Sequence, residues 1–397
     1  MAGLLQKLSL AFLLATSVTS KPISSPKNPI LAPRAGLDIL KTTVTDTHTL
    51  DWIPIDSQGT IASAPPLPAR RTNGSTPTVE LMQPGAEVGP LGSVPIPRVN
   101  PKLQASTNRI TKQLPATNHS AQKQEQKSKR QYSGNHWYVS SDQSVANIGG
   151  SAIFSIFAPY VQSSEDFSLL QTAVTRNNVP IPNNPSSSGS QTLEAGWINY
   201  PNQVSSPHLF TYFTTCAYQC SGDNKGGWNA DQAGWIQVNN KYYPGTVFVP
   251  NSVDGGAQYE IQIEYQLYQG NWWLYVIDTW IGYYPASIFS AGEADASVTL
   301  AAGSDTIFYY GEVFNNENAL TTTDMGSGEF AAAGAGKAAY MRNMVYQDAK
   351  SGFHDYTGGF WNSDIARYTN DAHLSSGTNW GSYVYLGGPG AGGIIRG

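Results

Sequence analysis

Short runs of β-branched and aromatic residues, separated by turn residues, recur through the second half of the chain and constrain its fold most. These runs are Ser151–Val161, Phe167–Thr175, Gln191–Tyr200, Leu209–Gln219, Gly234–Val238, Tyr259–Tyr268, Trp272–Ile281, Asp305–Phe314 and Ala338–Tyr346. Runs of this kind predict strands, whereas no long segment places apolar residues at helical spacing. We therefore predict an all-β fold, an antiparallel sandwich or barrel, with loops at 181–190 and 387–397.

The first twenty residues are typical of a secretory signal peptide. Lys7 precedes an apolar run, Leu8–Ala15, and small residues then lead to Ser20. A charged start, a short apolar core and a small-residue end are the parts of such a signal. The apolar run is too short to span a bilayer. The sequence predicts cleavage after Ser20 and a secreted, extracellular protein.

Residues 21–130 differ in composition from the rest of the chain. They are rich in Pro, Ser, Thr, Asn and Gln and almost free of aromatic residues, so they cannot bury much of a core by themselves. The stretch ends at Lys129 and Arg130, a pair typical of a kexin-type processing site, although a solvated basic linker would look the same. We expect a signal peptide (1–20), a largely irregular pro-segment (21–130) and a β-rich domain (131–397).

The sign of the net charge changes at the same place. Up to Arg130 the chain carries 15 Lys and Arg against 7 Asp and Glu, and the remainder carries 8 against 21. A basic segment beside an acidic domain can bind it electrostatically and lose its hold as carboxylates become protonated. We therefore expect the pro-segment to act as an inhibitor of the domain until cleavage and acidification.

The cysteines, histidines and glycosylation sequons complete the outline. Cys216 and Cys220 are the two cysteines of the chain, and in a secreted protein they are expected to form a local disulfide. The four histidines after residue 130 lack the close spacing of zinc sites, so no metal is predicted. Sequons at Asn73 and Asn118 predict N-glycans on the pro-segment.

Two glutamates stand in runs otherwise suited to a sheet interior. In a strand, Glu194 shares a face with Thr192 and Gly196, and Glu312 shares one with Tyr310. Glutamate is disfavoured in strands and rarely buried without a partner. The simpler interpretation is that each side chain points to solvent. If both faces line one cleft, however, the two carboxylates could supply the general base and the general acid that hydrolysis needs.

Other chemistries find less support. Gly-x-Ser-x-Gly is absent, as are phosphate-loop and dinucleotide fingerprints. An acidic domain argues against nucleic acid as a partner, so cofactor-free chemistry remains. Four rival carboxylates need placing: Glu260 and Glu264 share strand parity and are expected to face solvent, while Glu293 and Glu329 lie in turn-like contexts.

The order of several separated motifs resembles the neprosin family, secreted prolyl endopeptidases of the glutamic peptidase type. The motifs are Asp166–Gln171, Leu193–Pro201, Leu209–Phe213, Gly256–Glu260, Gly270–Leu274, Trp280–Pro285, Gly311–Val313, Met325–Phe330 and Gly336–Tyr340. The resemblance implies a β-sandwich of two antiparallel sheets with a substrate cleft. It also implies that Glu194 and Glu312 are the catalytic pair.

The expected function is a secreted, acid-active glutamic endopeptidase that cleaves proline-containing peptides, with cleavage after proline. One ionised glutamate would take a proton from the attacking water, and the other, protonated, would stabilise the oxyanion and protonate the leaving nitrogen. Because two nearby carboxylates titrate as a pair, the sequence does not assign these roles. Neither a cofactor nor a membrane partner is expected.

A prolyl substrate needs an apolar pocket and polar support for its peptide. We expect Trp197, Tyr212 and Tyr310 to line the cleft and Gln171 to supply polar support. Two alternatives remain open. A glycoside hydrolase would also use two carboxylates in an aromatic groove, and a secreted glycan-binding module would use the aromatic surface without turnover.

Overall fold

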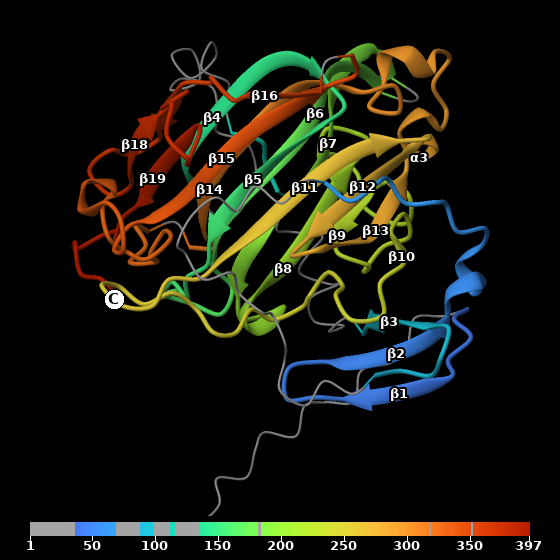
Figure 1. Cartoon of the computed structure of the whole chain (residues 1–397), viewed down its shortest axis with the longest axis horizontal. Helices are drawn as coiled ribbons and strands as arrows, with labels where there is room; N and C mark the ends of the chain where they lie inside the picture. Colours follow the sequence, from blue (N-terminus) through green and yellow to red (C-terminus); the bar gives the residue numbers. More distant parts are fainter. Residues whose placement is uncertain are drawn as a thin grey trace, which may run out of the picture. The chain divides into compact units, whose positions relative to one another are not determined.

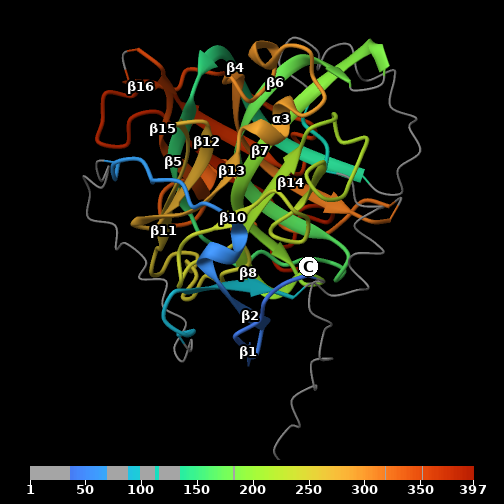
Figure 2. The ribbon, with the colours of Figure 1, turned by 90° about the vertical axis from the view of Figure 1, so that its right-hand side faces the viewer.

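A computed structural model describes residues 36–68, 88–98, 112–115, 135–181, 184–317, 319–350 and 352–397. Two antiparallel β-sheets stack face to face (Figure 1), which confirms the predicted all-β sandwich. In the view turned by 90° the sheet that contains β5, β12 and β15 separates from the one that contains β6, β7 and β14 (Figure 2).

The first sheet has nine strands. They are β5 (Gly149–Ser155), β10 (Ile236–Gln237), β11 (Glu260–Tyr268), β12 (Asn271–Val276), β13 (Thr279–Pro285), β15 (Ala339–Asp348), β16 (Gly352–Asp355), β18 (Thr369–His373) and β19 (Tyr383–Gly387). Their spatial order is β10-β13-β12-β11-β5-β15-β19-β18, and β16 pairs with β15.

The second sheet has seven strands and carries the site described below. They are β4 (Asn135–Asn147), β6 (Phe167–Ile181), β7 (Asn184–Tyr200), β8 (Val204–Thr214), β9 (Gly226–Trp228), β14 (Ser304–Asn315) and β17 (Phe360–Asn362). Their order is β17-β4-β14-β6-β7-β8-β9. Strands β14 and β7 flank β6, so residues far apart in sequence become neighbours on one face.

Alternation along the seven-stranded sheet separates two environments. Side chains such as Leu170, Leu193 and Trp197 join the main core, which they share with residues of the first sheet such as Tyr265. Successive side chains point to opposite faces of a strand. The intervening residues therefore lie on the outer face, where they form two separate aromatic clusters. This outer face holds the glutamates.

Each of the nine predicted runs contains a strand, with two corrections. The run 272–281 is a hairpin, β12 and β13, because the chain turns at Ile277 (φ 69°) and Asp278. The predicted loop at 181–190 is largely strand, because the β6–β7 pairing continues through Val179↔Gly189. Polar serines are compatible with this extension because ladder hydrogen bonds come from the backbone.

Part of the basic leader folds against the sandwich. Strands β1 (Lys41–Val44), β2 (Thr49–Pro54) and β3 (Ser93–Pro97) form a three-stranded sheet. Leu50 and Trp52 of β2 are buried with Tyr243. The leader thus completes its small core with a ring from the later part of the chain, as expected for a segment poor in apolar residues.

Several predictions about the leader fall outside the described residues. They concern the signal peptide, the Lys129–Arg130 processing site and the sequons at Asn73 and Asn118, and they stay predictions, as does the domain division at residue 130.

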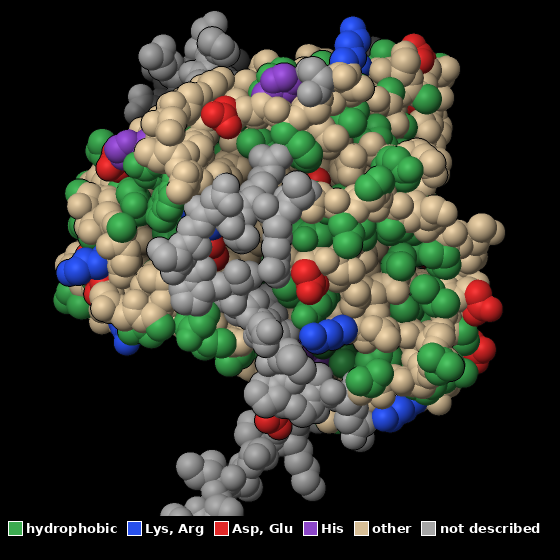
Figure 3. Space-filling view, in the orientation of Figure 1, with side chains coloured by type: hydrophobic (Ala, Val, Ile, Leu, Met, Phe, Trp, Pro, Cys, Tyr) green, Lys and Arg blue, Asp and Glu red, His purple; other side chains and the backbone are tan. Residues whose placement is uncertain are grey.

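The remaining elements are short helical turns: η1 (Ile55–Gln58), α3 (Ser287–Ser290), η2 (Ala296–Val298) and η3 (Ala331–Ala333). Over the described ranges, none of the helices has the length and apolarity that crossing a membrane requires. The face drawn in Figure 3 shows its described Lys and Arg side chains scattered among polar and apolar ones.

Candidate active site

The two predicted glutamates lie on the same face of the seven-stranded sheet. Glu194 is on β7 and Glu312 on β14, with β6 between them. Gln171 of β6 pairs with Tyr310 of β14 and donates its Nε2 hydrogen to Glu194 Oε2 at 2.7 Å. Both glutamate side chains are fully buried. Strand pairing alone therefore brings the carboxylates together, and the amide of Gln171 lies between them.

Lys112, from the basic leader, joins both carboxylates. Its Nζ lies 3.0 Å from Glu194 Oε2 and 2.8 Å from Glu312 Oε2. It also donates to Gln171 Oε1 at 2.5 Å. All three charged side chains have no solvent exposure. One small hydrogen-bonding group can thus touch both carboxylates and the amide at once, and buried charges need such pairing.

Phenol groups surround Glu194. Tyr218 donates to its Oε1 at 2.6 Å, Tyr310 donates to its Oε2 at 3.1 Å and Thr192 to its Oε1 at 3.3 Å. Burial, reinforced by the charge of Glu194, raises the pKa of Tyr218 and of Tyr310 well above the usual value. The two phenols therefore stay protonated and act as hydrogen-bond donors.

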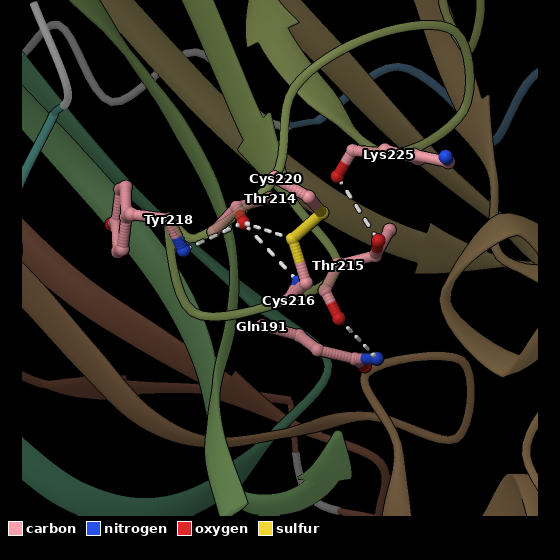
Figure 4. The surroundings of a disulfide bond; sticks show 7 residues. All are labelled: Gln191, Thr214, Thr215, Cys216, Tyr218, Cys220 and Lys225. Carbon is pink, nitrogen blue, oxygen red and sulfur yellow. Dashed lines mark hydrogen bonds between the residues drawn. A yellow bond between two sulfur atoms is a disulfide. The ribbon is translucent and has the colours of Figure 1, made fainter. Parts of the chain in front are cut away.

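The predicted disulfide positions one of these phenols. Cys216 and Cys220 are joined, and the short loop that they close carries Tyr218 (Figure 4). Thr214 Oγ1 accepts hydrogen bonds from the backbone N–H of Cys216 (3.2 Å) and of Tyr218 (3.0 Å). Ala217 and Tyr218 have φ of 56° and 60°, a left-handed conformation that costs about 1–2 kcal/mol per residue. The cross-link helps to hold this unfavourable turn.

Glu312 has a different set of neighbours. His136 Nδ1 lies 2.6 Å from its Oε1, and Tyr138 donates to the same oxygen at 3.4 Å. Burial alone would raise the pKa of Glu312, but Lys112 and His136 outweigh it, so that pKa lies below the ordinary value. Burial and the two glutamates raise the pKa of Tyr138 well above its usual range.

Three of the four residues predicted to line the site lie near Glu194, and one does not. Gln171 and Tyr310 contact Glu194 directly. Tyr212 pairs with Glu194 across β7 and β8, and its ring stacks on Tyr218 at 5.8 Å. Trp197 does not lie beside the glutamates, because its parity on β7 directs it into the main core. There its Nε1 donates to the Ser155 carbonyl at 2.8 Å.

The rival carboxylates lie away from this site. Glu260 is buried rather than facing solvent, because Arg342 and Tyr340 bind its carboxylate. Glu264 is also buried, at 1% exposure. Both expectations of solvent exposure were wrong. Glu293 and Glu329 are partly exposed and lie outside the strands, as their turn-like contexts indicated.

Sequence reasoning missed Lys112, His136, Tyr138 and Tyr218. Tyr218 could have been found, since it lies between the two cysteines. His136 and Tyr138 depend on the pairing of β4 with β14, and Lys112 contacts Glu312 across 200 residues of sequence. No local pattern reports such contacts. Among the described residues, no group of three or more His, Cys, Asp or Glu is arranged to hold a metal ion.

A known protein family matches most of the β-domain. The sequence model named Neprosin matches residues 164–389, more than half of the chain. The chain belongs to the neprosin family. This membership, together with the glutamate pair, supports a peptidase of the glutamic type.

Two solved structures are also similar to this neprosin-family chain. One is the crystal structure of Scytalido-glutamic peptidase with a peptide-based transition state analog, at 9% identity and a TM-score of 0.30. The other is SCP-B, a member of the Eqolisin family, in complex with the tripeptide Ala-Ile-His, at 7% identity and a TM-score of 0.28. Each comparison covers 64% of this chain and 98% of the other.

Proposed function

We propose that the protein is a secreted, acid-active glutamic endopeptidase that cleaves proline-containing peptides after proline. The contact of Lys112 Nζ with Glu194, Glu312 and Gln171 carries the proposal. A water molecule is similar in size to an ammonium group and makes hydrogen bonds at the same distances. When Lys112 withdraws, its Nζ position becomes a place for a water held by both carboxylates.

The mechanism follows from the shared environment of the carboxylates. Without the lysine cation, two buried carboxylates cannot both remain ionised, so the pair takes up a proton. The ionised member accepts a proton from the water as it attacks the scissile carbonyl. The protonated member stabilises the oxyanion and then protonates the leaving nitrogen. Because activity needs this singly protonated pair, we expect an acidic optimum.

Aromatic rings near the pair offer a place for a proline ring. The Lys112 ammonium lies 5.4 to 5.9 Å from the ring centroids of Phe167, Phe210, Trp228 and Tyr310. Three of these rings belong to one buried cluster on the outer face of the sheet. An apolar pocket with a few polar groups is the usual form of a small-ligand site. These rings support a preference for proline beside the scissile bond.

The basic leader supports a second element of the proposal, a zymogen with its own inhibitor. Lys112 occupies the position assigned to the attacking water, so the intact chain is expected to be inactive. Because the pKa of Glu312 lies below its ordinary value, its ion pair stabilises the inhibited state above that ordinary pKa. This stabilisation is lost as the pH falls through the lowered pKa. Acid therefore favours release.

The test begins with expression of the full chain and sequencing of the mature N-terminus, expected at Gln131. A quenched proline-containing peptide is then assayed from pH 2 to 7 beside Glu194→Gln and Glu312→Gln. Acid-dependent cleavage that is lost in both variants is the expected result. Folded mature protein without cleavage at any pH would refute the peptidase, and sugar release or saturable glycan binding would favour the glycan alternatives.

A further inference from the structure

Residues 113–115 of the leader also contact the domain beside the glutamates. The backbone carbonyl of Gln113 accepts a hydrogen bond from Tyr138 at 3.0 Å. Leu114 packs against an aromatic cluster on the outer face of the seven-stranded sheet, and Pro115 is buried. The leader therefore contributes a carbonyl contact and an apolar side chain as well as a cation, much as a bound peptide would.

The cluster around Leu114 is separate from the rings around the ammonium. It comprises Tyr138, Ala173, Phe308 and Tyr310, with Trp361 and Leu114 packed against it. Ring centroids lie 6.1 Å apart for Tyr138 and Tyr310 and 6.4 Å apart for Tyr138 and Trp361. Tyr310 and Tyr138 also contact the glutamates. This cluster, the Leu114 cluster, therefore borders the catalytic pair directly.

The small side chain at residue 173 lies within this cluster. Ala173 is paired with Phe308 on one side and with Glu194 on the other. A methyl group among larger aromatic side chains leaves room for an incoming residue, whereas a larger side chain would fill the space. Ala173 is thus positioned to control which residue the cluster accepts.

The cluster also holds a polar group that can recognise a peptide. Trp361 Nε1 is buried and has no hydrogen-bond partner among the described residues. A buried donor without a partner is costly, and a peptide carbonyl is a natural acceptor. Together with Tyr138, which already donates to the Gln113 carbonyl, the cluster combines apolar walls with side-chain donors for a peptide backbone.

We propose that the Leu114 cluster is a substrate subsite for a bulky aliphatic side chain two residues from the one at the glutamate pair. This inference rests on the proposed peptidase function and adds a second specificity element to the preference for proline. The occupant in the intact chain is Leu114 itself. Burying a leucine rather than an alanine at such a site favours cleavage by about tenfold or more.

The test uses acid-activated protein and quenched peptides with one proline each. Leu or Ala stands at the second position before or after that proline, since an inhibitory segment can run in either direction. Wild-type kcat/KM should favour Leu over Ala by about tenfold at one of the two positions. In Ala173→Leu this preference should vanish, because the added side chain fills the space that the leucine of the substrate would take.

A second variant and a binding measurement protect the test from a folding artefact. Phe308→Ala enlarges the subsite and should shift the preference toward larger side chains, whereas Phe353→Ala, on an exposed side chain of β16, should not. A peptide of sequence 109–118 should inhibit about tenfold less well when its leucine is replaced by alanine. Cleavage with equal kcat/KM for Leu and Ala overturns the subsite alone, and absence of cleavage overturns the peptidase.

Discussion

Docking of the leader should weaken in mild acid because it buries a neutral histidine. His48, which precedes β2, faces Tyr243 at a ring distance of 5.8 Å. Its Nδ1 contacts Thr47, and its Nε2 is buried with no partner among the described residues. Burial lowers the pKa of His48 from 6.5 to about 4. The nearby His208 is also buried, and its pKa is lowered to about 3.

The size of the effect follows from linkage. Below pH 6.5 an undocked His48 takes up a proton that the docked form does not bind until about pH 4. The contribution of neutral His48 to the free energy of docking is therefore fully present above pH 6.5 and falls as the pH drops toward 4. Across that window the difference amounts to about 3 kcal/mol. This lies above the range in which Glu312 titrates, so the two effects act in sequence.

Hydrogen exchange of the β2 amides in the full chain measures this docking. After correction for intrinsic exchange, the opening free energy of wild type should fall by about 3 kcal/mol between pH 6.5 and 4. His48→Gln should remove most of the fall, whereas the exposed His373→Gln should not. An equal fall in His48→Gln, or a flat wild-type profile, would refute the assignment.

Three further predictions concern the glutamate pair. Lys112→Met leaves two buried carboxylates without a cation, so the intact chain should lose about 3–5 kcal/mol of unfolding free energy at pH 7. Denaturant melts measure this loss, and the exposed Lys241→Met should not show it. Tyr218→Phe removes a donor to Glu194 and should lower kcat about tenfold or more, and an unchanged pH–rate profile and kcat would count against this role. Reduction of the disulfide frees the loop that holds Tyr218, so kcat of the wild type should fall by about the same factor. In Tyr218→Phe, which has already lost the phenol, reduction should hardly change kcat.

Strand parity explains how much of this site the sequence could supply. A period of two placed Thr192 on the face of Glu194 and Tyr310 on the face of Glu312, and in the structure Thr192 and Tyr310 both donate to Glu194. The same parity should have excluded Trp197, because its side chain lies on the opposite face of β7 from that of Glu194. Glu260 shows the limit of the method, because parity tells which side of a sheet a residue occupies but not what covers that side.

Non-local contacts account for the rest. The neighbours of Glu312 come from β4 and from the leader, through Tyr138 and Lys112, whose sequence separations from it are 174 and 200. Contacts at such separation depend on strand order, and strand order is not encoded in any short pattern. The opposed charges of the leader and the domain indicated that they attract each other, but not that a single lysine carries the contact.

Lys112 also has a consequence for the domain that the proposed processing would release. Together with His136 it keeps the pKa of Glu312 low in the intact chain. After its removal, burial and mutual repulsion should raise one carboxyl pKa of the pair above the unfolded value of about 4.3. The folded mature domain then binds more protons than the unfolded chain, so its stability should rise as the pH falls from 7 to 5.

Denaturant midpoints at pH 7 and 5 test this reversal. The mature domain should be more stable at pH 5, and Glu194→Gln, which leaves one carboxylate in the site, should lose most of that gain. The intact chain should show no gain, because its lysine already balances the pair. A mature domain whose midpoint does not increase in acid would mean that the carboxylates are too well hydrated to share a proton, which would undermine the proposed mechanism.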